Sequence, residues 1–175
     1  MPKVLIISDS HGLTDEVEEI KSRHRGEVEA MIHCGDSELP YDAPELEGYY
    51  YAKGNCDFEP EMVDDQVVTV GELTIYATHG HLYQIKSTLM PLSYRAEEVS
   101  AKVACFGHSH IAGAEKVNDK LFINPGSIRL PRDHKEPSYA ILEWSTLDEV
   151  SVQFYHVDGE PMTDLRMETS LAAKN

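Results

Sequence analysis

The sequence predicts an α/β protein whose strands run both parallel and antiparallel. The run Lys3–Ser8 is continuously apolar, which is typical of a strand buried on both faces of a parallel sheet, and we expect a second buried strand at Val28–His33. The segment between them has helical character, so the three form a strand–helix–strand unit with a right-handed crossover. Further along, Tyr139–Trp144 and Val150–Val157 alternate in polarity, as antiparallel strands do.

The helix between the first two strands is expected to begin after Thr14, whose side chain can cap the first turn. Two acidic residues follow, where the helix dipole favours negative charge. Val17 and Ile20 supply a modest apolar stripe that can face a sheet, and residues 23–26 end the helix. This segment therefore has the start, the buried face and the end that a crossover helix needs.

The remaining elements follow from apolar runs and turn residues. We expect a connection over residues 42–48, a short aromatic strand at Tyr49–Ala52, a hairpin of Val67–Val70 and Leu73–Thr78 around Gly71-Glu72, a partly helical segment at 85–101 interrupted by Pro91, and strands at Val103–Phe106 and Leu121–Ile123. We expect one domain over residues 1–165. Residues 166–175, which are small and polar without an apolar stripe, are expected to be a frayed tail.

The composition excludes several classes of protein. The formal net charge is −16, from 31 acidic and 15 basic residues, so we expect no nucleic-acid partner. No stretch approaches the roughly 20 apolar residues of a membrane span, and Met1-Pro2-Lys3 is too short for a signal peptide, so we expect a cytoplasmic protein with no membrane partner. Cys34, Cys56 and Cys105 form no CxxC pair, which argues against a disulfide framework and agrees with a reducing compartment.

Ligand-type side chains follow several of the expected strands. They occur in the order Asp9-Ser10-His11, Gly35-Asp36, Gly54-Asn55, His79-Gly80 and Gly107-His108-Ser109-His110. Each piece alone is weak, because Gly-Asp and Gly-Asn pairs are ordinary turns. Their order, and their placement after apolar runs, makes the case for a joint site. Seven oxygen and nitrogen donors are too many for one tetrahedral zinc ion but suit two adjacent divalent ions.

The series D-x-H, G-D, G-N, H-G and G-H-S-H resembles that of the calcineurin-like metallophosphoesterases, in particular the small YfcE-like phosphodiesterases of bacteria and archaea. The motifs extend from Asp9 to His110, and the general resemblance from Lys3 to about Val157. The resemblance implies a four-layer α/β/β/α sandwich of two mixed sheets with helices outside. It also implies a divalent-metal-dependent phosphoesterase, and more specifically a phosphodiesterase, whose nucleophile is a hydroxide bridging two metal ions.

The resemblance also assigns roles to single residues. The first ion would be held by Asp9, His11 and His110, the second by Asn55, His79 and His108, and Asp36 would bridge the two. Asp36 and Asn55 would thereby belong to the catalytic machinery. We favour manganese, although a nitrogen and oxygen ligand set also suits iron, nickel, cobalt and zinc. The expected partner is a small phosphoester substrate, and a homo-oligomer is open.

The chain departs from the wider family at Cys56, where the common pattern has a histidine that helps to protonate the leaving group. A thiol with a reference pKa of about 8.5 is a poorer acid than imidazolium near neutral pH. His81 is a candidate donor in its place; its alternative is a histidine hydrogen-bonded in a loop. Asp57 is expected either to orient Asn55 or a ligand histidine, or only to form a turn.

Ser127 and Arg129 are candidate phosphate contacts, and the segments 39–47 and 83–95 are expected to set substrate selectivity. The histidines outside the motifs are expected to be structural or solvated: His24, His33, His134 and His156. The competing class of function is a binding scaffold, because a retromer subunit resembles this fold and serves mainly as a scaffold. The complete ligand set of this chain favours chemistry over that alternative.

Overall fold

The computed structural model describes residues 1–132 and 136–172, whose strands form two mixed sheets. The first sheet contains β1 (Lys3–Ile7), β2 (Ala30–His33), β3 (Tyr49–Tyr51), β9 (Ser138–Trp144), β10 (Val150–His156) and β11 (Pro161–Thr169). Its strand order is β11-β10-β9-β1-β2-β3. The second contains β4 (Asp65–Val70), β5 (Leu73–Thr78), β6 (Val103–Cys105), β7 (Gly113–Val117) and β8 (Lys120–Asn124) in the order β4-β5-β6-β8-β7.

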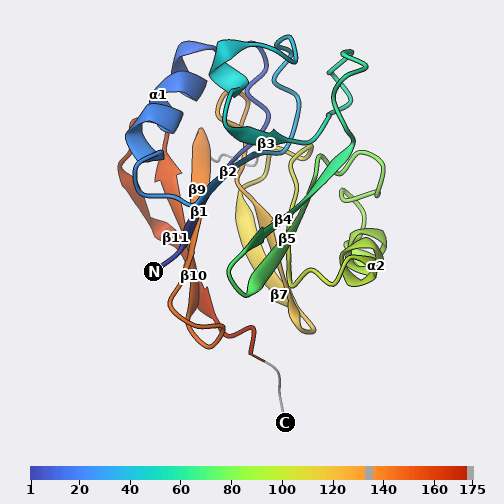
Figure 1. Cartoon of the computed structure of the whole chain (residues 1–175), viewed down its shortest axis with the longest axis vertical. Helices are drawn as coiled ribbons and strands as arrows, with labels where there is room; N and C mark the ends of the chain where they lie inside the picture. Colours follow the sequence, from blue (N-terminus) through green and yellow to red (C-terminus); the bar gives the residue numbers. More distant parts are fainter. Residues whose placement is uncertain (133–135, 173–175) are drawn as a thin grey trace.

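Helices α1 (Asp15–His24) and α2 (Met90–Glu98) lie on opposite sides of the pair of sheets (Figure 1). Side chains of the two inner faces form one core, in which Ile6 and Ile75, for example, have no exposed surface. On the outer face of the first sheet, Leu5 packs with Val17 of α1. On the outer face of the second, Phe122 packs with residues of α2. The predicted four-layer sandwich is confirmed.

Strand β1 explains why the N-terminal run is apolar throughout. It pairs in parallel with β2 and antiparallel with β9, and both of its faces are covered. The predicted strand–helix–strand unit is therefore present. Thr14 occupies the N-cap position of α1, as expected, but its side chain makes no capping hydrogen bond. The predicted β4–β5 hairpin is also present, with antiparallel pairing on either side of Gly71-Glu72.

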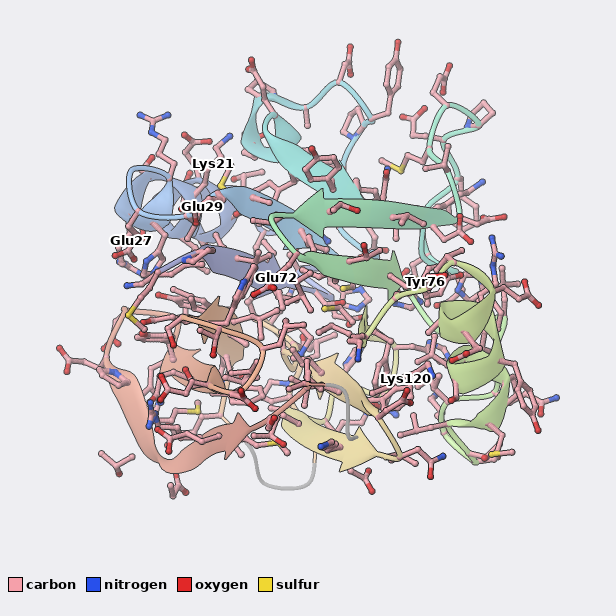
Figure 2. The ribbon with its side chains drawn as sticks, turned by 60° about the horizontal axis from the view of Figure 1, so that its bottom comes forward. Lys21, Glu27, Glu29, Glu72, Tyr76 and Lys120 are labelled. Atoms are coloured by element: carbon pink, nitrogen blue, oxygen red, sulfur yellow. The ribbon has the colours of Figure 1, made fainter. Side chains whose placement is uncertain are left out.

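Lys21 fastens the loop before β3 to helix α1. Its side chain is almost fully buried, and its ammonium group donates to the carbonyl oxygens of Pro44, Glu45 and Glu47 at 2.9, 3.2 and 3.0 Å. These residues belong to or follow the 3-10 helix η1 (Pro44–Leu46). Figure 2 shows Lys21 beside this part of the fold. The end of the 39–47 segment is thus held in place by one ammonium group that donates hydrogen bonds to three of its carbonyl oxygens.

Two expectations for the secondary structure were wrong, and one strand was missed. Pro91 lies in the first turn of α2 and begins the helix, because proline is tolerated where the backbone N–H has no helical partner. Strand β7 was not expected, because its sequence is largely polar. It lies at the edge of its sheet and pairs with β8 alone. The expected frayed tail is a strand as far as Thr169, and Leu171 is 2% exposed. Pairing with β10 orders this segment without a continuous apolar stripe.

In the part of the chain that the structure describes, no helix is both long and apolar enough to cross a membrane.

Candidate metal centre

The ligand-type residues converge where β1, β2, β5 and β6 end. Asp9, Asp36, His79 and His108 each lie one to three residues beyond one of these strands. Because β1 is parallel to β2 and β5 is parallel to β6, the loops that follow them emerge at a common edge of each sheet. The face-to-face packing of the sheets then brings residues from four distant parts of the sequence into one cluster.

Five side chains form the centre of this cluster: Asp9, His11, Asp36, His79 and His110. His79 Nε2 lies 3.0 Å from Asp9 Oδ1 and 3.1 Å from Asp36 Oδ2. His110 Nε2 is 3.1 Å from the same Asp9 oxygen, and it lies 3.3 Å from His11 Nε2. Two carboxylates and three imidazole nitrogens therefore face a common point.

The donor atoms fit divalent cations. Three overlapping groups have ligand atoms within 4.8 Å of one another: Asp9, His11 and His110; Asp9, Asp36 and His79; and His11, Asp36 and Cys56. Nitrogen and oxygen donors of this kind suit manganese, iron, cobalt, nickel or zinc. Each of Asp9, His11 and Asp36 belongs to two of the three groups, so the groups form one continuous cluster of donors.

Outer partners turn the histidines so that Nε2 faces inward. His110 Nδ1 donates to the carbonyl oxygen of Leu130 at 2.8 Å, and His11 Nδ1 lies 3.2 Å from Glu38 Oε2. A partner on one ring nitrogen fixes the tautomer and leaves the other nitrogen free to bind a metal ion. Glu38 and Leu130 are thus positioning groups that the sequence motifs did not reveal, because neither belongs to the ligand series.

The backbone of the cluster is strained. Nine non-glycine residues in the described chain have positive φ, and six of them lie here: Asp9, His11, Asp36, Glu38, His108 and His110. The left-handed conformation costs roughly 1–2 kcal/mol per residue for side chains with a Cβ. Such strain persists only where the surroundings determine the conformation, and it is concentrated at functional sites.

Two glycines allow the loops to approach the carboxylates. A Cβ atom at Gly54 would lie 2.0 Å from Asp36 Oδ1, and one at Gly107 would lie 2.4 Å from Asp9 Oδ2. Any larger residue would push these loops away from the cluster. The glycines of the G-N and G-H motifs therefore have a packing reason.

The electrostatics of the cluster depend on charge pairing within a buried site. Burial tends to raise the pKa of Asp9, but hydrogen bonds with His11, His110 and His79 outweigh it and hold the pKa well below its ordinary value. Burial likewise tends to raise the pKa of Asp36, and its contact with His79 lowers it overall. The carboxylates of Asp9 and Asp36 are thus ionised, and they attract cations.

The histidines respond in opposite directions. Burial tends to lower the pKa of His79, but Asp36 and Asp9 outweigh it and raise the pKa to about 9. Burial, followed by the charges of His79 and Lys86, lowers the pKa of His108 to about 4. Because a metal ligand must be an unprotonated imidazole, cations binding at this cluster would displace the proton of His79.

Comparison with known proteins settles the family. The profile of the calcineurin-like phosphoesterase superfamily domain matches residues 2–147. The chain belongs to this superfamily. YsnB, a probable metallophosphoesterase of Bacillus subtilis (strain 168), is 54% identical over 168 residues, covering 96% of this chain and 99% of that protein. Phosphodiesterase YfcE of Escherichia coli (strain K12) is 27% identical over 108 residues, covering 57% of this chain and 55% of that protein. The expected resemblance is confirmed.

Solved structures share the fold of this superfamily member. A conserved protein of Streptococcus pneumoniae TIGR4, a predicted phosphoesterase, superimposes with a TM-score of 0.93 at 38% identity, covering 97% of both chains. Vps29 of Chaetomium thermophilum superimposes with a TM-score of 0.76 at 21% identity, also covering 97% of both chains. The second likeness shows the shared fold alone.

Two motif residues, Asn55 and His108, and the candidate proton donor His81 lie at the margin of the cluster. Asn55 is exposed, and its amide nitrogen lies 3.8 Å from the sulfur of Cys56. The ring of His108 lies 5.1 Å from that of His79, between centroids, and its backbone N–H donates to Asp9 Oδ2 at 3.1 Å. His81 Nδ1 lies 3.2 Å from His79 Nδ1. The side chains of His108 and His81 thus lie against His79, whereas the side chain of Asn55 contacts Cys56.

Asp57 does not orient Asn55 or a ligand histidine, as one expectation held. Its carboxylate accepts hydrogen bonds from the backbone N–H groups of Asp36, Glu38 and Gly54 at 2.9, 3.0 and 2.8 Å, and from the Tyr51 hydroxyl at 2.6 Å. It therefore fastens the loop that carries Asp36 to the loop that carries Asn55. Its position after Asn55 could have indicated a supporting role, but not this set of partners.

The expectation that Ser127 contacts phosphate was also wrong. Ser127 is fully buried; its hydroxyl donates to the Asp9 carbonyl oxygen at 2.7 Å and accepts from the N–H groups of Arg129 and Leu130. It holds the loops together and has no surface for a ligand. The exposed Arg129 donates to the carbonyl oxygen of His11.

The histidines outside the motifs have protein partners where they are described. His33 Nε2 lies 2.9 Å from Ser10 Oγ, His24 bonds Glu27 and the Tyr139 hydroxyl, and His156 Nδ1 lies 2.7 Å from Glu136. These positions agree with a structural role. His134 lies outside the described residues.

All three cysteines are free thiols. Cys34 and Cys105 lie fully buried in the core between the sheets, where burial raises the pKa of each. Cys56 differs, because its sulfur joins His11 and Asp36 in one of the three donor groups. Burial and the charge of Asp36 raise the pKa of Cys56 to about 11, so this thiol is protonated at neutral pH.

Proposed function

We propose that the chain is a phosphodiesterase that binds two divalent metal ions. The single observation that carries this proposal is the set of three overlapping donor groups built on Asp9, His11 and Asp36. Its substrate would be a small phosphodiester, in agreement with the name of YfcE. The free cysteines fit a reducing compartment, and we propose a cytoplasmic location on that ground.

The proposed ligand sets extend the observed groups. Asp9, His11 and His110, which form one of these groups, would hold the first ion. Asp36 would serve both ions, and His79, together with Asn55 and His108 from the margin of the cluster, would complete the second set. When bound, two divalent cations lower the pKa of water, so that hydroxide is available near neutral pH, and they draw charge from the phosphate oxygens. We favour manganese among the ions that this donor set suits.

The chain's own acids limit which leaving groups it can help. The Cys56 thiol, with a pKa of about 11, is a weak proton donor at neutral pH. Burial and the nearby His79 lower the pKa of His81, so His81 is mostly neutral there. A leaving group that needs little protonation suffers least from a weak acid. We therefore propose that the best substrates have acidic leaving groups, such as phenols.

The alternative is a scaffold with little or no turnover, which the fold likeness to Vps29 keeps open. Catalysis is favoured by two features of this chain: every motif position has a ligand-type side chain, and strain is concentrated at these positions. A surface that only binds a partner does not require six strained residues that include two buried carboxylates.

The test is metal-dependent hydrolysis by the purified chain. Protein treated with a chelator should be inactive, and titration with manganese should restore hydrolysis of bis(4-nitrophenyl) phosphate. Hydrolysis of 4-nitrophenyl phosphate should be much slower if the enzyme is a diesterase. Asp36→Asn measures the contribution of the cluster. A wild-type protein that binds manganese, iron, cobalt, nickel or zinc but hydrolyses neither ester with any of them would support the scaffold instead.

The role of Cys56 at the leaving-group position can be tested separately. Cys56→His restores the imidazole of the wider family, so it should speed up diesters with poor leaving groups more than those with good ones. Rates for a series of aryl methyl phosphates with different phenol pKa values measure this dependence. Equal changes across the series would remove Cys56 from the leaving-group step.

A further inference from the structure

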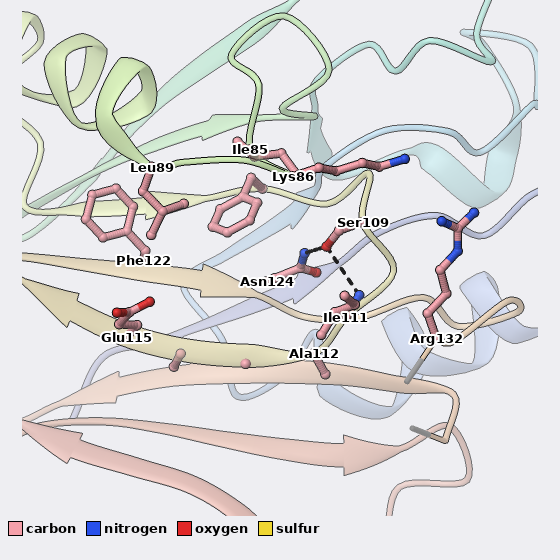
Figure 3. Close-up of a pocket in the computed structure, with 13 residues that line it drawn as sticks. Ile85, Lys86, Leu89, Ser109, Ile111, Ala112, Glu115, Phe122, Asn124 and Arg132 are labelled. Atoms are coloured by element: carbon pink, nitrogen blue, oxygen red, sulfur yellow. Dashed lines mark hydrogen bonds between the residues drawn. The ribbon is translucent and has the colours of Figure 1, made fainter. Parts of the chain in front are cut away.

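A cavity of about 620 Å³ lies beside the loop that carries His108 and His110 (Figure 3). Its walls are the segment 85–89, the ends of β6 and β8, and the start of β7. Ile85, Leu89, Phe106 and Phe122 make its lining mainly apolar, and Lys86 and Arg132 bring positive charge to it. None of the proposed metal ligands lines this cavity, although Ser109 of the G-H-S-H motif does.

Strand β7 presents a glycine to the cavity, Gly113. Ala112 and Ala114 turn toward the core between the sheets, so the alternation of a strand places Gly113 and Glu115 on the opposite face. Asn124 and Phe122, their partners on β8, also line the cavity. A Cβ atom at Gly113 would meet no other atom within 4 Å. The missing side chain therefore leaves room beside two aromatic residues.

The cavity adjoins the loop that carries His108 and His110. Ser109 lies between His108 and His110 and lines the cavity, and its hydroxyl is held by the Asn124 amide at 2.9 Å. The backbone N–H of Arg132 donates to the carbonyl oxygen of His110 at 3.1 Å. The loop that carries two proposed metal ligands thus also supplies part of the cavity wall.

The charges indicate which part of a ligand lies where. Figure 3 shows the charged groups of Lys86 and Arg132 at one end of the cavity and Glu115 at the other. In a chain with a formal net charge of −16, two cations at the end nearer the Ser109 loop favour an anion there. The apolar interior favours an uncharged, flat group. This combination matches one phosphate carrying an aromatic substituent.

We propose that this cavity is the subsite for the organic group that stays on phosphorus, and that this group is aromatic. The inference rests on the proposed function. Cys56 indicates on which side of the cluster the leaving group lies, because it occupies the leaving-group position of the wider family. Its sulfur lies with His11 and Asp36, which belong to loops of the first sheet. The cavity lies on the other side of the cluster, among loops of the second sheet.

The chemistry predicts where the product lies. Hydrolysis forms a bond from phosphorus to a water oxygen and breaks the bond to the leaving oxygen, which takes up a proton. The monoester product keeps the retained group. An aryl phosphate should therefore bind to the metal-loaded protein more tightly than inorganic phosphate does, whether or not turnover is measured.

The first test fills the cavity with Gly113→Leu. Two diesters share one leaving group and differ in the retained group: bis(4-nitrophenyl) phosphate and methyl 4-nitrophenyl phosphate. The variant should lower kcat/KM for the bis-aryl ester about tenfold, the scale on which an apolar pocket discriminates between substituents, and should change the methyl ester little. Gly26→Leu is the matched control, because a Cβ at Gly26 also meets nothing within 4 Å and this residue lies outside the cavity.

A second variant and a binding measurement complete the test. Ile111→Trp narrows the cavity from an exposed position, so it carries less risk to folding than a change within β7. Titration calorimetry with phenyl phosphate and inorganic phosphate on the manganese-loaded protein should show that both variants weaken only phenyl phosphate. Absence of turnover with this binding pattern would overturn the proposed function but keep the subsite. Equal effects on both diesters and both phosphates, or no effect in either variant, would overturn the subsite.

Discussion

His33 and His79 are two equally buried histidines at the ends of strands, and they lie in opposite environments. Both side chains have no exposed surface. His79 faces the carboxylates of Asp9 and Asp36, and its pKa is about 9. The His33 ring contacts the Ser10 hydroxyl and the Gly35 N–H, and burial lowers its pKa to about 4. Carboxylate partners, rather than burial, distinguish the cation site from the structural position.

The two environments also support each other. His33 Nδ1 accepts a hydrogen bond from the backbone N–H of Gly35 at 3.0 Å, so Nε2 carries the proton and donates to Ser10 Oγ. Gly35 and Ser10 are neighbours of Asp36 and Asp9. The neutral His33 therefore fixes the two loops that carry the charged carboxylates of Asp9 and Asp36. This account predicts that removing the charge and removing the fixed ring have different consequences.

The largest effect is expected from Asp36→Asn. The amide retains an oxygen for the Cys56 N–H, which now bonds Asp36 Oδ1 at 2.8 Å, but it loses the negative charge that two cations would share. Activity should fall by about 100-fold or more, and metal content should drop below two ions per chain. Kinetics and elemental analysis measure both. The matched control is His33→Asn, which should keep its metal ions; a loss of metal from His33→Asn equal to that from Asp36→Asn would contradict the comparison.

The next effect concerns stability in acid. Because the folded pKa of His33, about 4, lies below the ordinary value of 6.5, the unfolded chain binds its proton first as the pH falls. The free energy of unfolding that the neutral His33 contributes is complete above pH 6.5. It is lost as the pH falls toward 4, by roughly 3 kcal/mol in total. Urea unfolding of chelator-treated protein at pH 7.5, 5.5 and 4.5 measures it.

His33→Asn should flatten this dependence on pH, because an asparagine Oδ1 can accept the Gly35 N–H and takes up no proton. The difference in slope between the wild type and the variant isolates His33 from the carboxylates of the metal cluster. Parallel slopes for the two proteins would show that His33 is not held neutral in the folded state.

The smallest effect is expected from Asp57→Asn, which sharpens the boundary between the two environments. Asp57 touches neither histidine, yet it accepts the N–H of Asp36 and of Gly54. The variant keeps one acceptor oxygen and should weaken metal binding about tenfold, as is usual for groups that orient ligands. Titration with manganese measures the affinity. An unchanged affinity together with lower unfolding free energy would make Asp57 a stability residue only.

The apolar runs predicted the interior of the fold well, because β1, β2 and β6 are covered on both faces and their sequences show it. They missed β7 and β11, where strand pairing at the edge of a sheet orders polar sequences. Edge strands need little apolar surface, so periodicity cannot reveal them. Pro91 shows a related limit, since proline is compatible with the first turn of a helix as well as with its end.

The motif order predicted which residues of the site come together more completely than it predicted their supports. Asp9, His11, Asp36, His79 and His110 were all named from the sequence, and the structure brings them into contact. Glu38 and the Leu130 carbonyl were missed, because they act through the fold and carry no motif of their own. The apolar cavity was missed as well, since it depends on how Gly113 faces residues of other strands.

The most direct test of the account is to count metal ions while following activity. Chelator-treated protein is titrated with manganese, bound ions are measured by mass spectrometry after removal of free metal, and hydrolysis of bis(4-nitrophenyl) phosphate is followed in the same samples. The overlapping donor groups predict that activity rises until about two ions are bound per chain. Full activity at one ion per chain, with no further binding, would contradict the dinuclear centre.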